Sequence, residues 1–592
     1  MIEVPDPSIL TVVMIKPSHY DSEGYPITWL RTIVPSNTLA ALYGIGLDAT
    51  KRQVLGEAVA IHLEPHDETN RRIQPAKILS AISKRGGKAL ICLVGVQSNQ
   101  FERAVDLAKP FLAAGVPVMM GGFHISGCLS MLKETPAEIK AAMALGISMF
   151  AGEAEEGRFD EVLRDAWNGT IKPLYNYLKD LPKLNNEPTP LLPASEIKYN
   201  YGARSSFDLG RGCPFQCSFC TIINVQGRKS RFRTPEDLER IVLENDAQGI
   251  HQFFITDDNF ARNREWEGFF DVLIRLRKTR GIKVKLIIQV DTQCHKIPRF
   301  IDKAAKAGVR RAFIGLENIN PDNLVAAKKR QNKITDYRIL LQKFRDHGIF
   351  TWAGYILGFP GDTKQSILRD IEIIKKELPL DLLEMFFLTP LPGSEDHRTL
   401  LDKGEWMDPD LNKYNLHNRV SHHPKMSDAE WEEAYEAAWA SYYSYDHIET
   451  VARRHAVGDN AKAVSKVVSY LMEFKAIYEI ERVHPLEGGV FRMKYRTDRR
   501  PTLSRELPGL FHAKLFAETA VKAVRYLNLA LRGYTIVRKV TRDPQRLAYT
   551  DLAIKPVSAD ELDELSIFSQ TEGGEAAAER KRIIERHKKV AA

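Results

Sequence analysis

The chain has 592 residues, which is too long for one hydrophobic core and suggests roughly three or four domains of about 150 residues each. Hydrophobic residues make up 44% of the chain and charged residues 27%, as is typical of a globular protein. The formal net charge of +8 is small for this length and requires no nucleic acid partner, and no apolar run reaches the ~18 residues that a membrane-spanning helix needs.

The start of the chain and its cysteines indicate a reducing, cytoplasmic location. Residues 1–6 have neither the basic nor the apolar region of a secretory signal peptide. Six cysteines are present, but three stand in one loop, so they do not make a disulfide framework. Cys92, Cys128 and Cys294 are isolated, and we expect them to be buried free thiols.

Residues 9 to about 170 alternate short apolar runs with helical stretches. Strands are expected at 9–15, 89–95, 116–122 and 148–152. The last three end in glycine, and a helical segment follows each strand, which predicts a parallel, doubly wound sheet. We therefore expect residues 1–170 to form a flavodoxin-like (Rossmann-like) α/β domain.

Three loops at the carboxyl ends of these strands hold the candidate ligand-binding residues of the first domain, because ligands of such sheets bind at that edge. The candidates are Gln97, Ser98, Asn99, Gly121, Gly122, His124, Gly152 and Glu153. Glycine-rich loops on parallel sheets serve many ligands, so a scaffold without any ligand is the alternative.

Residues 171–204 are rich in proline and asparagine. They include Pro173, Pro182, Pro188, Pro190 and Pro193. Since each proline restricts the backbone to an extended conformation, this segment is expected to be a linker.

One short loop after the linker is the most informative part of the chain. It places Cys213, Cys217 and Cys220 in a C-x3-C-x2-C spacing, directly after a strand-like stretch. Three thiolates on one tight loop can hold three irons of a [4Fe–4S] cluster and leave the fourth iron open. A zinc site is the alternative, but zinc sites usually have four ligands, and the nearest later candidates are Cys294 and His295. The spacing therefore favours a cluster with a vacant coordination position.

With Phe219 in its aromatic place, the loop resembles the signature of the radical S-adenosylmethionine enzymes. The resemblance implies that the three cysteines ligate a [4Fe–4S] cluster and that S-adenosylmethionine chelates the open iron. It implies reductive cleavage to a 5′-deoxyadenosyl radical, with the electron supplied by a flavodoxin- or ferredoxin-type donor. Such chemistry requires shielding from water.

The first domain resembles the cobalamin-binding domain that precedes the radical core in one large subfamily. A G-G-x-H loop, here Gly121 to His124, and a later Gly-Glu-x-Glu turn, here Gly152 to Glu155, are recurrent there. The resemblance implies that the eight loop residues named above bind cobalamin. The D-x-H-x-x-G signature that supplies a histidine to cobalt is absent, so we expect cobalamin to be held without a histidine on cobalt.

Residues 205–394 contain six strand candidates, each followed by a helix. The strands centre on Phe207, Phe254, Ile287, Phe313, Tyr355 and Phe386. Six β/α units cannot close an eight-stranded barrel, so they suggest a partial (β/α)6 TIM-like barrel, which is also the fold that the resemblance implies. Its active site would lie at the carboxyl ends of the strands.

Polar and glycine motifs follow successive strands of this barrel. The residues that the resemblance implies for S-adenosylmethionine are Phe219, Asp257, Asp258, Asn259, Gly315, Glu317, Gly358 and Pro360. Carboxylates after the second strand suit the methionine ammonium, with an Asx turn as the alternative. The G-x-P-G-x-T turn at Gly358 is expected to set the shape beside the cofactor.

Residues 395–545 have helical periodicity, and a tail at 546–592 is expected to end in a mobile or marginal helix. A capping box at Ser427 to Glu430 opens a helix with an aromatic stripe. The stripe consists of Trp431, Tyr435, Trp439 and Tyr442. Core packing is expected for it, with contact to a flat or greasy substrate as the alternative. Residues 510–531 repeat the periodicity.

A basic run lies between the two helical segments. It contains Arg492, Lys494, Arg496, Arg499, Arg500 and Arg505. Three interpretations are open: a solvated surface, which is favoured, a site for a phosphate-bearing substrate, or a patch that rests on anionic lipid. Peripheral membrane contact is thus a possible property of this chain.

The resemblance implies methylation of an unactivated carbon in a small-molecule or lipid-like substrate, with cobalamin as methyl carrier. Cobalamin-linked cyclisation or rearrangement is the alternative within the subfamily. An RNA methylthiotransferase would need a second cysteine triad, and only Cys92 and Cys128 stand in the first domain. The alternative from another class is a non-catalytic iron–sulfur or zinc protein that binds nucleic acid through 492–505. No nucleic acid partner is expected.

Overall fold

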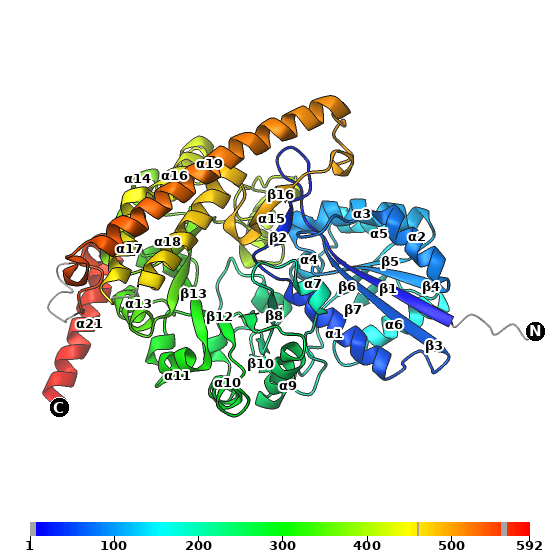
Figure 1. Ribbon diagram of the computed structural model, residues 1–592, viewed down its shortest axis with the longest axis horizontal. Coiled ribbons are helices and arrows are strands. Elements are labelled where there is room, and N and C mark those ends of the chain that lie inside the picture. Colours follow the sequence, from blue (N-terminus) through cyan, green and yellow to red (C-terminus); the bar gives the residue numbers. More distant parts are fainter. Residues whose placement is uncertain (1–7, 459–460, 558–564, 592) are drawn as a thin grey trace, which may run out of the picture.

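Two six-stranded parallel sheets, each covered by helices, organise the chain. In Figure 1 the first sheet is blue to cyan and the second is green, and the C-terminal helices are yellow to red. The computed structural model describes residues 8–458, 461–557 and 565–591. The predicted fold class, α/β with a mainly helical C-terminal region, is confirmed.

The first sheet has the strand order β3-β1-β4-β5-β6-β7. Its strands are β1 (Ser8–Lys16), β3 (Val59–Asp67), β4 (Lys88–Leu93), β5 (Val118–Gly121), β6 (Ile147–Ala151) and β7 (Leu174–Asn176). The first five follow the flavodoxin-like order, in which the second strand of the sheet lies outside the first. The sequence predicted β1, β4, β5 and β6 but missed β3 and β7. β3 is a partly exposed edge strand without a continuous apolar run, and the three-residue β7 lies within the predicted linker.

Alternate residues of β1 belong to two different cores, because neighbouring side chains of a strand point to opposite faces. Val12 and Met14 share a core with α1 and α6, and this core is continuous with that of the second sheet. Val13 and Ile15 pack with α2 to α5. The helices of the domain are α1 (Asn37–Lys51), α2 (Pro75–Arg85), α3 (Phe101–Ala113), α4 (Phe123–Met131), α5 (Ala137–Ala144) and α6 (Arg158–Asn168). The first domain is thereby joined to the rest of the molecule through the α1 face.

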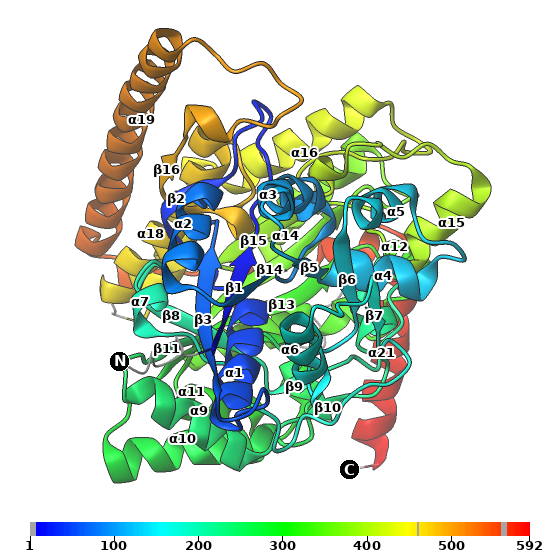
Figure 2. The same cartoon turned by 90° about the vertical axis from the view of Figure 1, so that its right-hand side faces the viewer.

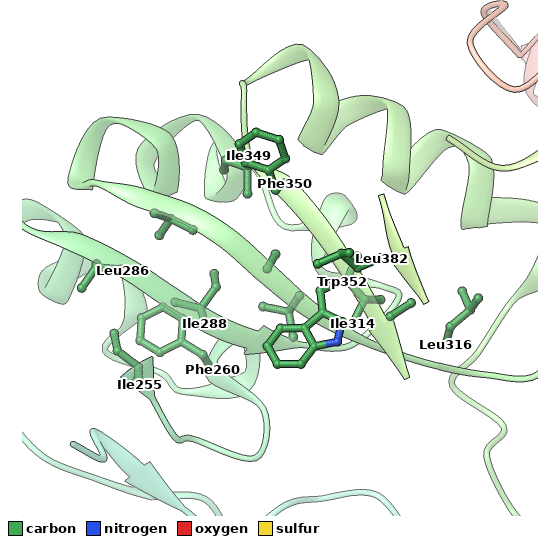
Figure 3. Close-up of a cluster of buried hydrophobic side chains, with 14 of the residues drawn as sticks. Ile255, Phe260, Leu286, Ile288, Ile314, Leu316, Ile349, Phe350, Trp352 and Leu382 are labelled. Carbon is green, nitrogen blue, oxygen red and sulfur yellow. The ribbon is translucent and has the colours of Figure 1, made fainter. Parts of the chain in front are cut away.

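The second sheet has the order β15-β14-β13-β12-β11-β8. Its strands are β8 (Arg204–Phe207), β11 (Gln252–Ile255), β12 (Lys285–Val290), β13 (Val309–Glu317), β14 (Phe350–Leu357) and β15 (Leu382–Phe387). Each predicted strand centre lies in one of them. The edge strands β8 and β15 pair with one neighbour each, so the sheet is an open, partial barrel. Figure 3 shows apolar side chains of this sheet, among them Ile288, Ile314 and Trp352.

Helices connect the strands of the second sheet. They are α8 (Ile222–Val225), α9 (Pro235–Asp246), α10 (Trp266–Arg280), α11 (Phe300–Ala307), α12 (Pro321–Ala326), α13 (Tyr337–Asp346) and α14 (Lys364–Glu377). α9 begins as its sequence predicts: the Thr234 side chain accepts a hydrogen bond from the Asp237 amide, and Pro235 holds the first helical position. A short antiparallel pair, β9 (Gly210–Arg211) and β10 (Arg231–Phe232), brackets the cysteine loop.

The C-terminal region is mainly helical. Its helices are α15 (Glu395–Lys403), α16 (Asp428–Tyr442), α17 (Tyr445–Ala456), α18 (Ala461–Ala476), α19 (Pro508–Arg542), α20 (Ser566–Ser569) and α21 (Glu572–Ala591). The aromatic stripe of α16 is buried, as its spacing predicts, and Trp439 stacks on Tyr478 at 4.5 Å. α21 is not a loose tail, because Ala578 is buried and the Lys581 ammonium donates to the Thr335 carbonyl.

A two-stranded antiparallel pair ties the C-terminal region to the first domain. It joins β2 (Thr28–Thr32) to β16 (Gly489–Met493), which lie side by side in Figure 2. The predicted basic run begins in β16, and its cations are largely neutralised within the chain: Arg492 pairs with Asp21 at 2.8 Å, and Lys494 pairs with Glu23 and Glu518. Within the part of the chain that the structure describes, none of the helices combines the length and the apolar composition that spanning a bilayer requires.

Candidate active site at the cysteine loop

The three cysteines stand on a loop that backbone contacts hold in place. Gly212 has φ +86°, and a Cβ there would lie 2.5 Å from the Lys229 carbonyl oxygen, so only glycine fits. The Cys213 amide donates to the Gly227 carbonyl, and the Cys220 amide donates to the Cys217 carbonyl. Contacts within the polypeptide therefore hold the loop in this conformation.

The donor set fits a [4Fe–4S] cluster with one open iron. All three thiols are free; Cys217 is buried, and Cys213 and Cys220 are half-buried. Burial raises the pKa of the Cys213 thiol to about 11, and a metal would have to displace that proton. Cys294, a ligand of the zinc alternative, is buried in the barrel core. A site closed by Cys294 gains no support from this placement.

A buried lysine that the sequence did not single out lies beside the cysteines. The Lys329 ammonium lies 2.5 Å from a Glu317 carboxylate oxygen and 5.8 Å from the centre of the Phe219 ring. Glu317 has φ +62°, an uncommon conformation for a residue other than glycine, at a register shift of β13 against β14. At Gly315 a Cβ would lie 2.8 Å from the Glu317 carboxylate. Glycine at 315 thus leaves room for this ion pair at the strand end.

The acidic motif after β11 divides into structural and accessible groups. Asp257 accepts hydrogen bonds from the Leu209 amide at 2.7 Å and from the Asn263 side chain at 3.1 Å, so it secures the approach to the cysteine loop. Asn259 donates to Asp291 at 2.6 Å. Asp258 is exposed to solvent, but the dense protein around its carboxyl and the charge of Asp257 raise its pKa to about 7. Of the three, Asp258 has the carboxylate that remains available to a ligand.

The turn after β14 is built by its own backbone contacts. Gly358 has φ +99°, and a Cβ there would lie 2.2 Å from the Trp431 ring. The Asp362 carboxylate accepts hydrogen bonds from the Gly358 and Phe359 amides. Pro360 is exposed. The prediction that this turn sets shape agrees with these contacts.

An apolar cavity of 170 Å³ lies at the carboxyl ends of the first sheet. Four predicted cobalamin-binding residues line it: Gly121, Gly122, Gly152 and Glu153. At Gly122 a Cβ would lie 2.2 Å from the Val96 nitrogen, so the wall requires glycine there. Arg211, Val225 and Gln226, which flank the cysteine loop, form the opposite wall. The geometry fits a ligand that reaches from the first domain towards that loop.

The other four predicted cobalamin-binding residues lie outside this cavity. Gln97 precedes a short helical turn at Ser98–Gln100, and the Ser98 hydroxyl lies 3.1 Å from Nδ1 of His124. Nε2 of the fully buried His124 lies 3.6 Å from a Glu138 carboxylate oxygen. Asn99 donates to Glu487 at 3.0 Å. His124 therefore faces α5 (Ala137–Ala144) rather than the cavity, and its predicted contact with cobalamin stays a prediction.

Arg211 connects the cavity to the cysteine loop electrostatically. Its guanidinium pairs with Glu153 at 2.8 Å, Glu155 at 2.7 Å and Asp208 at 3.1 Å. The two glutamates come from the first domain, and Asp208 follows β8. Arg211 stands two residues before Cys213, so these ion pairs fix the loop against the first domain.

Comparisons with known proteins agree with this architecture. Residues 208–374 match the Radical SAM superfamily model. The chain is 27% identical over 343 residues to a bacteriochlorophyllide d C-8(2)-methyltransferase of Chlorobaculum tepidum, covering 55% of this chain and 71% of that protein. It is 30% identical over 215 residues to a hopanoid C-2 methylase of Rhodopseudomonas palustris, covering 34% and 39%.

The fold is also similar to that of the radical S-adenosylmethionine methyltransferase TsrM from Kitasatospora setae, solved with cobalamin and a [4Fe–4S] cluster bound. The TM-score is 0.53 at 16% identity, over 74% of this chain and 90% of that one. The cysteine loop and most of the open barrel lie within residues 208–374, which form a radical S-adenosylmethionine domain, and the chain is an enzyme whose cofactors include a [4Fe–4S] cluster and S-adenosylmethionine.

Proposed function

We propose that this enzyme uses cobalamin to methylate an unactivated carbon of an apolar small molecule. The main support is the cavity of the first domain, because Arg211 and Gln226, which flank the cysteine loop, form part of its wall. Two relatives named as methylating enzymes and a fold shared with a cobalamin-bound methyltransferase point the same way.

The cofactors, when bound, supply single-electron chemistry and a transferable methyl group. Cys213, Cys217 and Cys220 hold the cluster in this proposal, and Asp258 receives the ammonium of S-adenosylmethionine. The Lys329 ammonium lies beside the thiolates, with its charge balanced by Glu317. The residues of the first domain's cavity hold part of cobalamin.

The substrate site is proposed to lie on the apolar side of Phe219. There a small cluster of Ile356, Phe386, Leu416 and Leu486 packs beside Phe219, and Phe386 stacks on His484 at 4.8 Å. Such a wall excludes water and suits a lipid-like or flat apolar molecule. A flavodoxin- or ferredoxin-type protein is the proposed electron donor, in the cytoplasm.

The test uses the full chain, purified and reconstituted without oxygen. With dithionite, S-adenosylmethionine and hydroxocobalamin, the wild type should form 5′-deoxyadenosine and show corrinoid absorption bands after gel filtration. Cys213→Ala should lose nucleoside formation and the cluster band, whereas Cys128→Ala, which removes a buried thiol of α4, should keep both. Retained nucleoside formation in the Cys213 variant would contradict the proposal.

Methylation and ring formation differ in the fate of the methyl group. With S-adenosylmethionine labelled at the methyl carbon, methylation places label in a small-molecule product made by an extract of the source cell. Corrinoid binding without label in any product would favour cyclisation or rearrangement. A loss of corrinoid binding would reduce the first domain to a scaffold.

A further inference from the structure

α19 (Pro508–Arg542) packs on the body of the protein along one main stripe and, near its start, through the buried Phe511, whose ring lies 5.7 Å from that of Tyr25. Leu529, Gly533, Ile536 and Val540 are buried, at spacings of four, three and four residues. Gly533 packs against Val468 and Met472 of α18. The amino-terminal half of the helix extends past the rest of the molecule, as Figures 1 and 2 both show.

The opposite side of α19 is apolar and faces solvent. Five large side chains there are between 57% and 77% exposed: Phe516, Val524, Leu527, Leu531 and Tyr534. At about 100° per residue they fall within a sector of roughly 80°, on the side opposite the buried stripe. One face of this helix packs on the protein core, and the opposite face is also apolar but exposed. An exposed apolar face of this kind marks a binding surface.

The charges of α19 indicate the kind of partner. Arg538 and Arg542 fall within the sector of the apolar face, near the end of the helix, and both are exposed. Three other cations lie nearer the buried stripe and contact the body of the protein: Lys514 pairs with Glu506, Lys539 pairs with Glu449, and Arg532 lies over the Tyr445 ring. Within the described part of the chain, Arg525 and Arg538 make no ion pair. The one carboxylate of the helix, that of Glu518, turns inward to Lys494 and Lys522. The outward face is therefore apolar and positively charged, without acidic residues.

We propose that α19 binds an anionic membrane surface, lying along the interface with its apolar face among the acyl chains. An apolar face that also carries basic side chains is typical of interfacial helices, and cations near an anionic surface strengthen the binding. Two copies of this face would place like charges together, so self-association is disfavoured. The surface is α19 and not the basic run at 492–505, whose cations pair with acids of the same chain.

Vesicle flotation of the full chain tests the proposal. The probes are phosphatidylcholine vesicles with and without phosphatidylglycerol, at low and high salt. The wild type should float with the anionic vesicles and be released by salt. Leu527→Gln/Leu531→Gln should weaken binding by about a hundredfold, since each leucine contributes roughly tenfold when buried. The double variant Ile583→Gln/Ile584→Gln, which changes exposed aliphatic residues of α21, is the matched control and should bind as the wild type does.

A second measurement reports insertion directly. Tryptophan at Leu527 (Leu527→Trp) should emit at shorter wavelength when anionic vesicles are added, and it should not respond to neutral vesicles at high salt. Wild-type protein that does not float, or binding unchanged by the leucine substitutions, would overturn the proposal. So would a dimer in light scattering that the leucine substitutions dissociate, because the face would then belong to a second copy. Neither readout depends on radical chemistry.

Discussion

His417 is an example of a titratable residue whose environment decides its charge. Its Nδ1 lies 3.1 Å from the Tyr435 hydroxyl, and its ring packs near Tyr478 and His484. Burial lowers the pKa of His417 to about 4, and nearby Glu487 offsets only part of this shift. The imidazole is therefore neutral in the folded protein at neutral pH.

The lowered pKa of His417 predicts acid sensitivity. An unfolded histidine has a pKa near 6.5, so between about pH 6.5 and 4 the unfolded chain binds a proton that the folded chain does not. Stability from this residue is complete above that window and falls as the pH drops through it, by about 3 kcal/mol in total.

Urea unfolding at several pH values measures this effect. His417→Gln should flatten the fall in stability between pH 6.5 and 4, because glutamine does not titrate. His62→Gln, at an exposed histidine of β3, is the control. An unchanged pH slope in the His417 variant would show that other groups cause the acid sensitivity.

At the scale of elements, the turn between β14 and α14 depends on the helix that covers it. Gly358 combines φ +99° with direct contact to the Trp431 ring of α16. α16 in turn packs on α14 and β15, and the Tyr435 hydroxyl donates to the Met385 carbonyl of β15. A single glycine thus positions a C-terminal helix on the barrel.

Gly358→Ala should therefore destabilise the protein by about 3 kcal/mol or more, from the backbone conformation and from the clash with Trp431. Gly404→Ala is the matched control: its φ is +69°, but a Cβ there would have open space. That variant should lose only about 1 kcal/mol. Denaturant unfolding followed by tryptophan fluorescence separates the two, and equal losses would refute the role of the Trp431 contact.

At the scale of the whole molecule, the first domain and the barrel are joined by packing and by charge. α1 contributes to the core shared with the barrel, and Arg211 pairs with Glu153 and Glu155 across the boundary. The cavity of the first domain lies at the same boundary. The two domains must keep a fixed separation if a ligand in the cavity is to serve the cysteine loop.

Arg211→Met should loosen this boundary, because it leaves the buried Glu155 without its ion-pair partner, although Glu153 keeps Arg231 and Asp208 keeps Arg233. Breaking such an arrangement costs about 3–5 kcal/mol. Calorimetry should show the first domain unfolding before the barrel, and protease should cut near residues 171–204 sooner. Arg275→Met, which removes an exposed pair with Glu239, should change neither. A single unshifted transition in the Arg211 variant would contradict this coupling.

Some features of the site could not be predicted from the sequence, because they depend on contacts between distant residues. Lys329 stands in no motif, and it meets Glu317 only because the chain bends back after α12. Asp257 and Asp258 are neighbours of equal chemistry, yet their hydrogen bonds give one a structural role and leave the other accessible. Among the loop residues of the first domain, the glycines reach the cavity, whereas His124 turns to Glu138.

The cluster chemistry and the two-sheet architecture could be predicted from the amino acids alone. The spacing of the three cysteines can be read directly along the chain. The six apolar runs separated by helical segments show the periodicity of strands and helices. The tertiary structure decided which strands β3 and β7 join, which polar groups remain available, how Arg211 couples the domains, and that the apolar second face of α19 meets solvent. These depend on contacts between residues far apart in the chain, where burial and pairing are settled only when the elements come together.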